Sequence, residues 1–334
     1  MIGKIRTRNR VFLAPMSGVT DEAFRQASHD TAAGLVVSEM VASEELVRQR
    51  RDMVRRALGA KKLSPFVMQL AGREAHWMAE GAKVAQDLGA DIIDINMGCP
   101  ARQVTGGLSG SALMRNLDHA ITLVAATVGA ARVPVTLKMR LGWDEKSLNA
   151  PELARRAEAA GVAMITVHGR TRCQFYTGKA DWRAIRAVRE AIKIPLVANG
   201  DCHSPDDARA MMQASGADAV MIGRGAYGRP WWPGVVAEAL EPGSGVQHPS
   251  LAQERDVLLN QQADTLSLYG AELGNKTFRK HLGWTIARMA ARRMLDAVTV
   301  QEARRNVLNE RNNTLVTSSI MQLFAQVALH KEAA

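Results

Sequence analysis

Eight short apolar runs, rich in β-branched residues, recur along the chain and restrict its fold more than any other feature. Their starts are separated by roughly 24 to 43 residues, which leaves room for a helix and two loops between neighbouring runs. Strands that are apolar throughout and alternate with helices form a parallel sheet covered on both faces. Eight such units predict an α/β fold closed into a TIM (β/α)8 barrel. The runs cover residues 11–16, 35–40, 65–71, 91–97, 134–141, 164–170, 195–201 and 219–226.

An open, doubly wound sheet is the alternative fold for the same alternation of strands and helices. Such a sheet commonly carries GxGxxG after its first strand, whereas the first run here ends in Ala14-Pro15-Met16 and no such motif follows it. Polar residues instead follow nearly every run. Because the active site of a TIM barrel lies at the carboxyl ends of its strands, this distribution favours the barrel.

The pattern of the sequence changes after Gly228-Arg229-Pro230. Prolines and glycines crowd a turn-rich stretch, and from Leu251 to about His330 the sequence is typical of helices only. A chain of 334 residues has room for a barrel and one smaller domain. We therefore expect a barrel domain at 1–240, a linker at 241–250 and a smaller all-helical domain at 251–334.

The chain is strongly basic, with 43 Lys and Arg against 33 Asp and Glu and a pI of about 9.9. Such a charge favours a polyanionic partner such as nucleic acid or an anionic membrane surface, although a basic cytosolic enzyme would show it too. Residues 275–295 contain six basic residues and no acidic one. The basic side of the helix expected here is either exposed to solvent or binds RNA. An RNA-binding face would use Lys276, Arg279 and Lys280.

Features of secreted, membrane-spanning and metal-binding proteins are missing from the sequence. The first apolar run is too short for a signal-peptide core, and no apolar stretch of 18 residues occurs. Cys99, Cys173 and Cys202 are the three cysteines and form no CxxC pair, which argues against a disulfide framework or a metal site. We expect a soluble cytoplasmic protein without a bound metal.

Two glycine-containing motifs follow the seventh and eighth runs. Asn199-Gly200-Asp201 and Gly223-Arg224-Gly225 offer backbone N–H groups and a guanidinium where barrels commonly hold a ligand phosphate. Either motif alone could simply be a tight turn between strand and helix. Their occurrence at adjacent strand ends favours a phosphorylated cofactor.

Lys138 lies within the otherwise apolar strand Thr136-Leu137-Lys138-Met139. A lysine is rarely buried without a partner, so one that points into the barrel implies an anionic group there. A reduced flavin carries negative charge near its N1 atom and would be stabilised by such a cation. The alternative is that the side chain reaches out to the barrel rim.

Cys99 follows the fourth run within Gly98-Cys99-Pro100, where Gly98 permits a turn and Pro100 prevents the strand from continuing. A lone cysteine is usually a small buried hydrophobic residue. At the carboxyl end of a barrel strand, however, its thiol would enter the active site. Because most thiols are protonated at neutral pH, Cys99 could serve as a general acid.

With these residues in view, the chain resembles the bacterial tRNA-dihydrouridine synthases, close to their B-type branch. The resemblance covers both expected domains, and its motifs are highly specific when taken together. They are APMSGVTD (14–21), QLAG (69–72), DINMGCPA (94–101), GSALM (110–114), VTLKMRLGW (135–143), HGRTR (168–172), ANGD (198–201), MIGRGAYGRPW (221–231) and FRKHLGW (278–284).

The resemblance implies an FMN-binding barrel followed by a tRNA-binding helical domain, with NADPH as the reductant. It makes Cys99 the proton donor to C5 of a tRNA uridine that receives a hydride from flavin N5 at C6. Contact with the substrate is expected from Asn96, Arg170, Lys276, Arg279 and Lys280. Contact with FMN is expected from Pro15, Met16, Ser17, Gln69, Lys138, His168, Asn199, Gly200, Asp201, Gly223 and Arg224. A monomer without an obligate protein partner is expected.

Two other functions compete with this interpretation. An FMN barrel that reduces a small molecule would explain the strand ends but not the basic helical domain. A non-catalytic RNA-binding protein would explain the charge, but it would leave Lys138, Cys99 and the two glycine motifs without a purpose.

Overall fold

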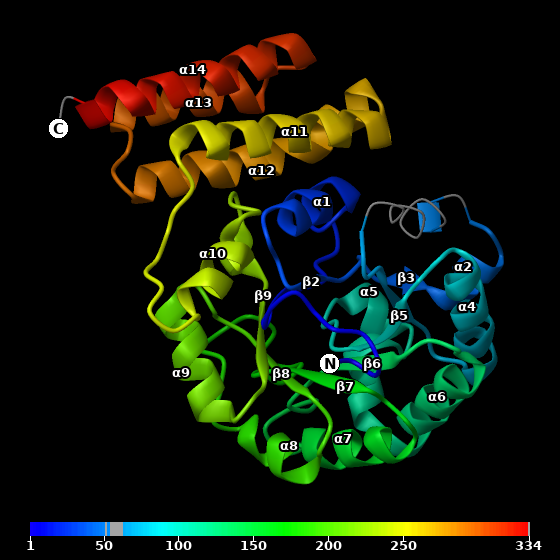
Figure 1. The fold of residues 1–334 in the computed structure, drawn as a ribbon. Coiled ribbons are helices and arrows are strands. Elements are labelled where there is room, and N and C mark those ends of the chain that lie inside the picture. The colour runs from blue at the N-terminus through cyan, green and yellow to red at the C-terminus, as the bar shows by residue number, and fades with distance from the viewer. Residues whose placement is uncertain (51, 54–62, 333–334) are drawn as a thin grey trace.

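The protein forms a parallel barrel followed by four helices in a computed structural model that describes residues 1–50, 52–53 and 63–332 (Figure 1). Nine strands are hydrogen-bonded in the order β2-β1-β9-β8-β7-β6-β5-β4-β3. A parallel bridge between Val37 and Val67 joins the end of β2 to β4 and closes the ring. The strands are β1 (Val11–Leu13), β2 (Leu35–Val36), β3 (Val41–Ala42), β4 (Val67–Ala71), β5 (Ile92–Met97), β6 (Val135–Arg140), β7 (Met164–His168), β8 (Leu196–Asn199) and β9 (Ala219–Ile222).

The second predicted strand is the one that differs most from the structure. Residues 35–40 were expected to form one strand, but β2 ends at Val36 and β3 begins at Val41. Between them the Ser38 hydroxyl accepts a hydrogen bond from the backbone N–H of Gln69 at 2.9 Å. This side chain takes the place of a backbone carbonyl in the ladder, so regular pairing stops and β2 and β3 together occupy one position of the barrel.

Helices form an outer layer around the barrel (Figure 1). Apolar side chains pack between strands and helices, while a second cluster that includes Phe12, Val67 and Met221 fills the barrel interior. The helices are α1 (Glu22–Asp30), α2 (Ser43–Val47), α4 (Ala75–Asp87), α5 (Arg102–Gly106), α6 (Leu117–Ala130), α7 (Ala150–Ala159), α8 (Arg186–Ala191), α9 (Pro205–Ser215) and α10 (Trp232–Ala239), with the 3-10 turns η1 (Gly110–Arg115) and η2 (Arg224–Ala226).

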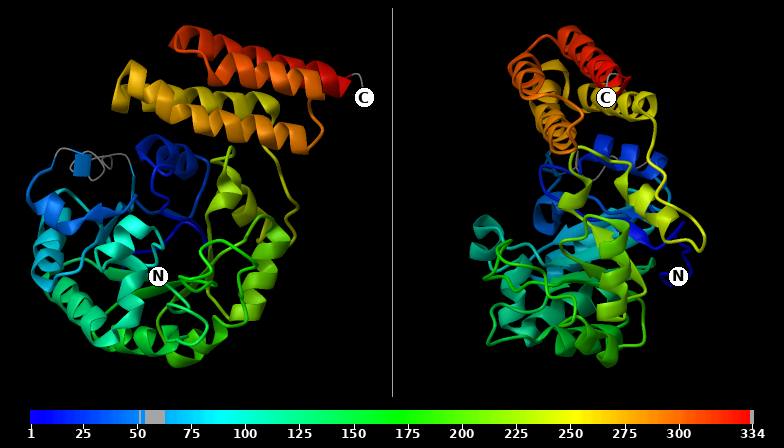
Figure 2. Two further views of the ribbon diagram at one scale, coloured as in Figure 1. Left: turned by 180° about the vertical axis from the view of Figure 1, so that it is seen from behind. Right: turned by 90° about the vertical axis from the view of Figure 1, so that its left-hand side faces the viewer.

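The C-terminal helical region consists of α11 (Leu251–Tyr269), α12 (Ala271–Ala291), α13 (Ala297–Leu308) and α14 (Asn313–Glu332). Both views of Figure 2 show this region lying against one side of the barrel. Helix α11 packs on α1, and the hydroxyl of Thr285 in α12 donates to the carbonyl of Gly228, just after η2. Among the described residues, no helix is long and apolar enough to cross a membrane.

Candidate active site

A cavity of about 590 Å³ opens at the carboxyl ends of the strands. Most of the side chains singled out in the sequence line it, because parallel strands direct their carboxyl ends to the same face of a barrel. Those that do so are Pro15, Met16, Ser17, Gln69, Asn96, Cys99, Lys138, His168, Asn199, Gly200, Asp201, Gly223 and Arg224.

Lys138 points from β6 into this cavity and donates from Nζ to Asn199 Oδ1 at 3.0 Å. No carboxylate of the described residues lies within ion-pair distance of its ammonium group. Burial lowers the pKa of Lys138 to about 8, because a desolvated cation is costly. A cation of this kind is suited to receive an anionic or electron-rich group from a ligand.

A chain of buried hydrogen bonds leads from Asp94 to the backbone of Cys99. Gln69 and Thr136 stand beside Asp94 in the parallel register and donate to its carboxylate at 2.7 and 2.6 Å. The side-chain oxygen Oε1 of Gln69 then accepts from Asn96 Nδ2 at 2.7 Å. Asn96 Oδ1 in turn accepts from the N–H of Cys99 at 3.0 Å. Three neighbouring strands therefore hold the loop that carries the thiol.

The Cys99 side chain is partly buried and lines the cavity. Burial raises the pKa of its thiol above the ordinary value of 9.0, and the nearby Arg140 and Lys138 oppose this shift only in part. The thiol therefore keeps its proton at neutral pH. A protonated thiol in a cavity of this kind can act as a general acid.

The cavity is strongly electropositive around His168. Burial lowers the pKa of His168 well below 6.5, and the neighbouring cations Arg140, Lys138 and Arg170 lower it further. The imidazole is therefore neutral and can offer one donor and one acceptor. Such surroundings favour a ligand that carries negative charge.

Arg170 does not line the cavity, although the sequence suggested a contact with the substrate. Its side chain is 1% exposed and binds both carboxylate oxygens of Asp201, at 2.9 and 2.6 Å. Asp201 also accepts from Arg224 at 3.1 Å and has a positive φ of 54°. The guanidinium also donates to the carbonyls of Thr177 and Gly178 at 3.0 and 2.7 Å, so Arg170 holds Asp201 and the loop after β7 together, and its contact with the substrate stays a prediction.

The donors of the cavity fit FMN. Lys138 provides an unpaired cation at the cavity wall, and η2 brings Gly223 and Arg224 to the same cavity beside Asn199. A Cβ added at Gly223 would lie 3.5 Å from Met16 Sδ, so the glycine keeps this wall free of a side chain. A guanidinium next to glycine backbone suits a phosphate, and Lys138 suits the polar edge of a flavin ring.

Three aromatic residues at the cavity were missed by the sequence reasoning. Phe175 and Tyr176 lie in the loop after β7, and the exposed Tyr176 ring is 4.9 Å from the Arg224 guanidinium and 5.5 Å from that of Arg140. Tyr227 follows η2 and stacks on Trp284 of α12 with ring centroids 3.9 Å apart. Phe175 and Tyr176 follow no predicted run directly. Tyr227 directly follows the eighth run and lies in the motif at 221–231, but only the glycines and the arginine of that segment were singled out.

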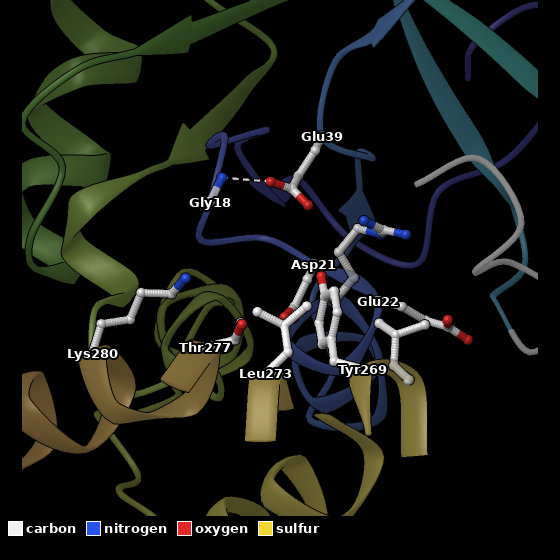
Figure 3. A pocket seen from close by; sticks show the side chains of 10 residues that line it. Gly18, Asp21, Glu22, Glu39, Tyr269, Leu273, Thr277 and Lys280 are labelled. Atoms are coloured by element: carbon white, nitrogen blue, oxygen red, sulfur yellow. Dashed lines mark hydrogen bonds between the residues drawn. The ribbon is translucent and has the colours of Figure 1, made fainter. Parts of the chain in front are cut away.

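The basic residues expected to bind RNA all lie on α12 but have different surroundings. Lys276 is exposed, whereas Arg279 is half-buried and donates to the Glu310 carbonyl at 2.9 Å. Lys280 lines a small pocket of about 190 Å³ between the barrel and the helical region. Figure 3 shows Glu39 and Gly18 of the barrel on one side of this pocket and Lys280, Leu273 and Tyr269 on the other.

Comparison with known families gives a match over nearly the whole chain. The family described as Dihydrouridine synthase (Dus) matches residues 12–320. A protein named "Probable tRNA-dihydrouridine synthase" from Rhizobium leguminosarum bv. phaseoli is 58% identical over 283 residues, which cover 85% of this chain and 87% of that protein. A protein named tRNA-dihydrouridine synthase B from Xanthomonas axonopodis pv. citri is 46% identical over 283 residues, 85% of each chain.

Solved structures of other enzymes share the fold. Morphinone reductase in complex with tetrahydroNAD superposes with a TM-score of 0.52 at 15% identity, over 76% of this chain and 92% of that one. Histamine dehydrogenase from Rhizobium sp. 4-9 superposes with a TM-score of 0.55 at 15% identity, over 84% of this chain and 50% of that one. At such identities the likeness concerns the fold alone, and it confirms the predicted barrel.

Proposed function

This chain belongs to the dihydrouridine synthase family of oxidoreductases, and from that premise we propose that it reduces specific uridines of tRNA to 5,6-dihydrouridine with FMN and NADPH. The observation that carries the proposal is the shared cavity of Cys99 and Lys138, in which a protonated thiol and an unpaired cation face the same space. When bound, FMN would supply the hydride that passes from its N5 atom to C6 of the uridine.

The residues of the chain supply the rest of the reaction. Lys138 would stabilise negative charge on the bound flavin ring, and Arg224 with Gly223 would hold its phosphate. A uridine turned out of its stack would enter the cavity mouth, where Asn96 contacts the base. The thiol of Cys99 would deliver a proton to C5, so that one hydride and one proton together saturate the C5–C6 bond. The thiolate would then regain its proton from water.

The proposal extends to the reductant, the partner and the location. We propose that the nicotinamide of NADPH and the RNA base use the one cavity in turn. The helical region is proposed to be the domain, at 251–334, that binds tRNA through Lys276, Arg279 and Lys280. Because tRNA is the proposed substrate, we propose that the protein acts in the cytoplasm. We also propose that it acts as a monomer.

Replacing the thiol tests the function directly. We expect Cys99→Ala to keep its flavin and to lose roughly 10²–10⁴-fold in the rate of uridine reduction, the range that a general acid contributes. Dihydrouridine formed on unmodified tRNA is measured by mass spectrometry. Cys173→Ala is the matched control, because that cysteine is free and exposed, and it should retain full activity. Full turnover by Cys99→Ala would contradict the assigned role.

Two further outcomes would favour the competing functions. Reduction of free uridine as fast as uridine in tRNA would indicate a small-molecule reductase. A colourless protein that takes up no FMN would indicate a non-catalytic RNA-binding protein.

A further inference from the structure

A row of alternating guanidinium groups and aromatic rings extends outward from the rim of the cavity. The Arg115 guanidinium lies 4.9 Å from the centre of the Trp143 ring, and that of Arg172 lies 4.6 Å from the same ring. Arg172 is also 4.7 Å from the ring of Phe175, which lines the cavity. We call these four residues the cation–aromatic ladder.

The positive charges of the ladder have no carboxylate partner within the part of the chain that the structure describes. Neither Arg115 nor Arg172 forms an ion pair with a carboxylate of the described residues. Arg115 is exposed, and Arg172 is half-buried, with its Nη2 atom donating to Thr105 Oγ1 at 3.3 Å. Its Nε atom is buried and has no partner among the described residues. Two guanidinium groups without a carboxylate partner thus contact one indole ring.

The ladder and the helical region lie on opposite sides of the cavity. The ladder residues come from three neighbouring connections: Arg115 follows β5, Trp143 follows β6, and Arg172 and Phe175 follow β7. The helical region packs on α1, which follows β1, and on the loop after β9. With β2 and β3 sharing one position, the ring has eight positions, and β1 stands four positions away from β6. A molecule that touched both surfaces would cross the mouth of the cavity.

We propose that the cation–aromatic ladder is a second RNA-contact surface, which binds the phosphodiester backbone and one unstacked base of the substrate tRNA beside the reacting uridine. The inference rests on the proposed function and extends it to a surface outside the helical region. Guanidinium groups neutralise phosphates, and an indole ring offers a stacking face to any base. Contact on both sides of the mouth increases the affinity for a tRNA that crosses it.

Arg115→Gln and Trp143→Leu test the surface without changing a residue that faces the flavin. Binding of unmodified tRNA to the flavin-loaded protein is measured by fluorescence anisotropy at several salt concentrations. For Arg115→Gln we expect about fivefold to tenfold weaker binding and a salt slope reduced by roughly one, because one phosphate contact is lost. For Trp143→Leu we expect about tenfold weaker binding from lost stacking, and Trp143→Phe should restore most of it.

A matched control separates a local contact from the general effect of charge. Arg132→Gln removes the same charge from a side chain that is 82% exposed, between α6 and β6 at the opposite end of the barrel. It should change tRNA affinity less than twofold. An equal loss for Arg132→Gln and Arg115→Gln would overturn the inference, because only the net charge would then matter.

Steady-state kinetics distinguishes RNA contact from support of the Cys99 loop. The inference expects KM for tRNA to rise in Arg115→Gln and Trp143→Leu while kcat at saturating tRNA is unchanged. A fall in kcat with unchanged tRNA affinity would overturn it and assign the ladder a structural role. If the variants bind tRNA like the wild type, the inference fails while the proposed function stands. If the wild type neither binds nor reduces tRNA, the proposed function itself has failed.

Discussion

Burial changes the acidity of the two groups at the centre of the cavity in opposite directions. It raises the pKa of the neutral acid Cys99 and lowers the pKa of the cationic acid Lys138, because in each case desolvation penalises the charged form. The thiol thereby keeps its proton, and no carboxylate in the described part of the chain lies within ion-pair distance of Lys138. Both features suit a site that binds an electron-rich ligand.

Removing the cation at Lys138 should shift the redox balance of the bound flavin. In Lys138→Met the proposed charged hydrogen bond to the reduced, anionic ring would be lost, and the oxidised ring would need that bond less. Such a bond contributes about 1.5–3 kcal/mol, which corresponds to a midpoint potential more negative by roughly 30–60 mV. Spectroelectrochemistry measures the shift. Lys193→Met, on the exposed connection between α8 and β8, is the control. An unchanged midpoint potential in Lys138→Met would show that the Lys138 ammonium group does not contact the flavin ring.

At the scale of elements, three adjacent strands meet in one buried polar layer. Gln69 of β4, Asp94 of β5 and Thr136 of β6 lie side by side in register, and Asp94 accepts from both neighbours. The layer connects strand pairing to the orientation of Asn96 and hence of the Cys99 loop. Asp94 is therefore a positioning residue.

Loss of the shared acceptor should weaken both the barrel and the reaction. Asp94→Ala leaves the Gln69 amide and the Thr136 hydroxyl unpaired, so the free energy of unfolding should fall by about 1–3 kcal/mol. We expect kcat to fall while FMN still binds, and Asp94→Asn to recover part of both losses. The control is Thr166→Ala in β7, because the Thr166 hydroxyl is buried without a partner. Equal losses of stability for Asp94→Ala and Thr166→Ala in urea unfolding would refute the argument.

Helix α1 begins with a carboxylate that is unusually costly to ionise. Asp21 caps the helix by accepting from the Phe24 N–H at 3.0 Å, and burial raises its pKa to about 6. A raised pKa in the folded state means that stability is lost as the pH rises from the unfolded value of 3.8 through about 6. Above that range the folded protein holds a buried charge.

A neutral cap at this position should stabilise the protein in a pH-dependent manner. Asparagine caps helices as well as aspartate, so Asp21→Asn should retain the hydrogen bond to Phe24. We expect a gain of about 1–3 kcal/mol in the free energy of unfolding at pH 7.5 and little change near pH 4. Urea unfolding at the two pH values measures it. A loss of stability at pH 7.5 would show that attraction between Asp21 and the buried Arg25 outweighs the cost of burial.

At the scale of the molecule, the helical region is attached to the loop that also forms the proposed phosphate site. Gly228 has a φ of 66°, and a Cβ there would lie 2.5 Å from the backbone nitrogen of Thr285 in α12. The stacked pair of Tyr227 and Trp284 crosses the same junction. The helical region and the cavity are therefore joined through a close contact between two backbones.

A methyl group at Gly228 should separate the two parts. Gly228→Ala forces α12 away from the loop, so we expect a lower melting temperature. We also expect at least tenfold weaker binding of tRNA, because the two proposed RNA-contact surfaces would no longer be aligned. Gly243→Ala is the matched control: its φ is 80°, but a Cβ there would meet nothing within 4 Å. Gly243→Ala therefore reports only the cost of placing a non-glycine residue in a left-handed backbone conformation, about 1–2 kcal/mol. Equal effects of the two variants on tRNA binding would argue against coupling through the junction.

The barrel and the residues at its mouth could be predicted from the sequence alone. Short apolar runs rich in β-branched residues favour buried strands, and in a parallel barrel every strand carries its terminal polar residues to the same face. For this reason Lys138, Cys99, Asn199 and Gly223 could be brought together before any coordinates were known. The resemblance of its motifs to those of the tRNA-dihydrouridine synthases then indicated FMN as the cofactor and tRNA as the substrate.

The pairing of side chains that lie far apart in the sequence depends on the tertiary structure. Arg170 binds Asp201 and two backbone carbonyls of its own loop, and Ser38 interrupts the second strand by accepting from a backbone N–H of β4. The stack of Tyr227 on Trp284 joins the loop after η2 to helix α12, and the cation–aromatic ladder joins the end of η1 to the loops after β6 and β7. Strand periodicity reports which residues are buried, whereas contacts between loops depend on the closed ring that brings those loops together.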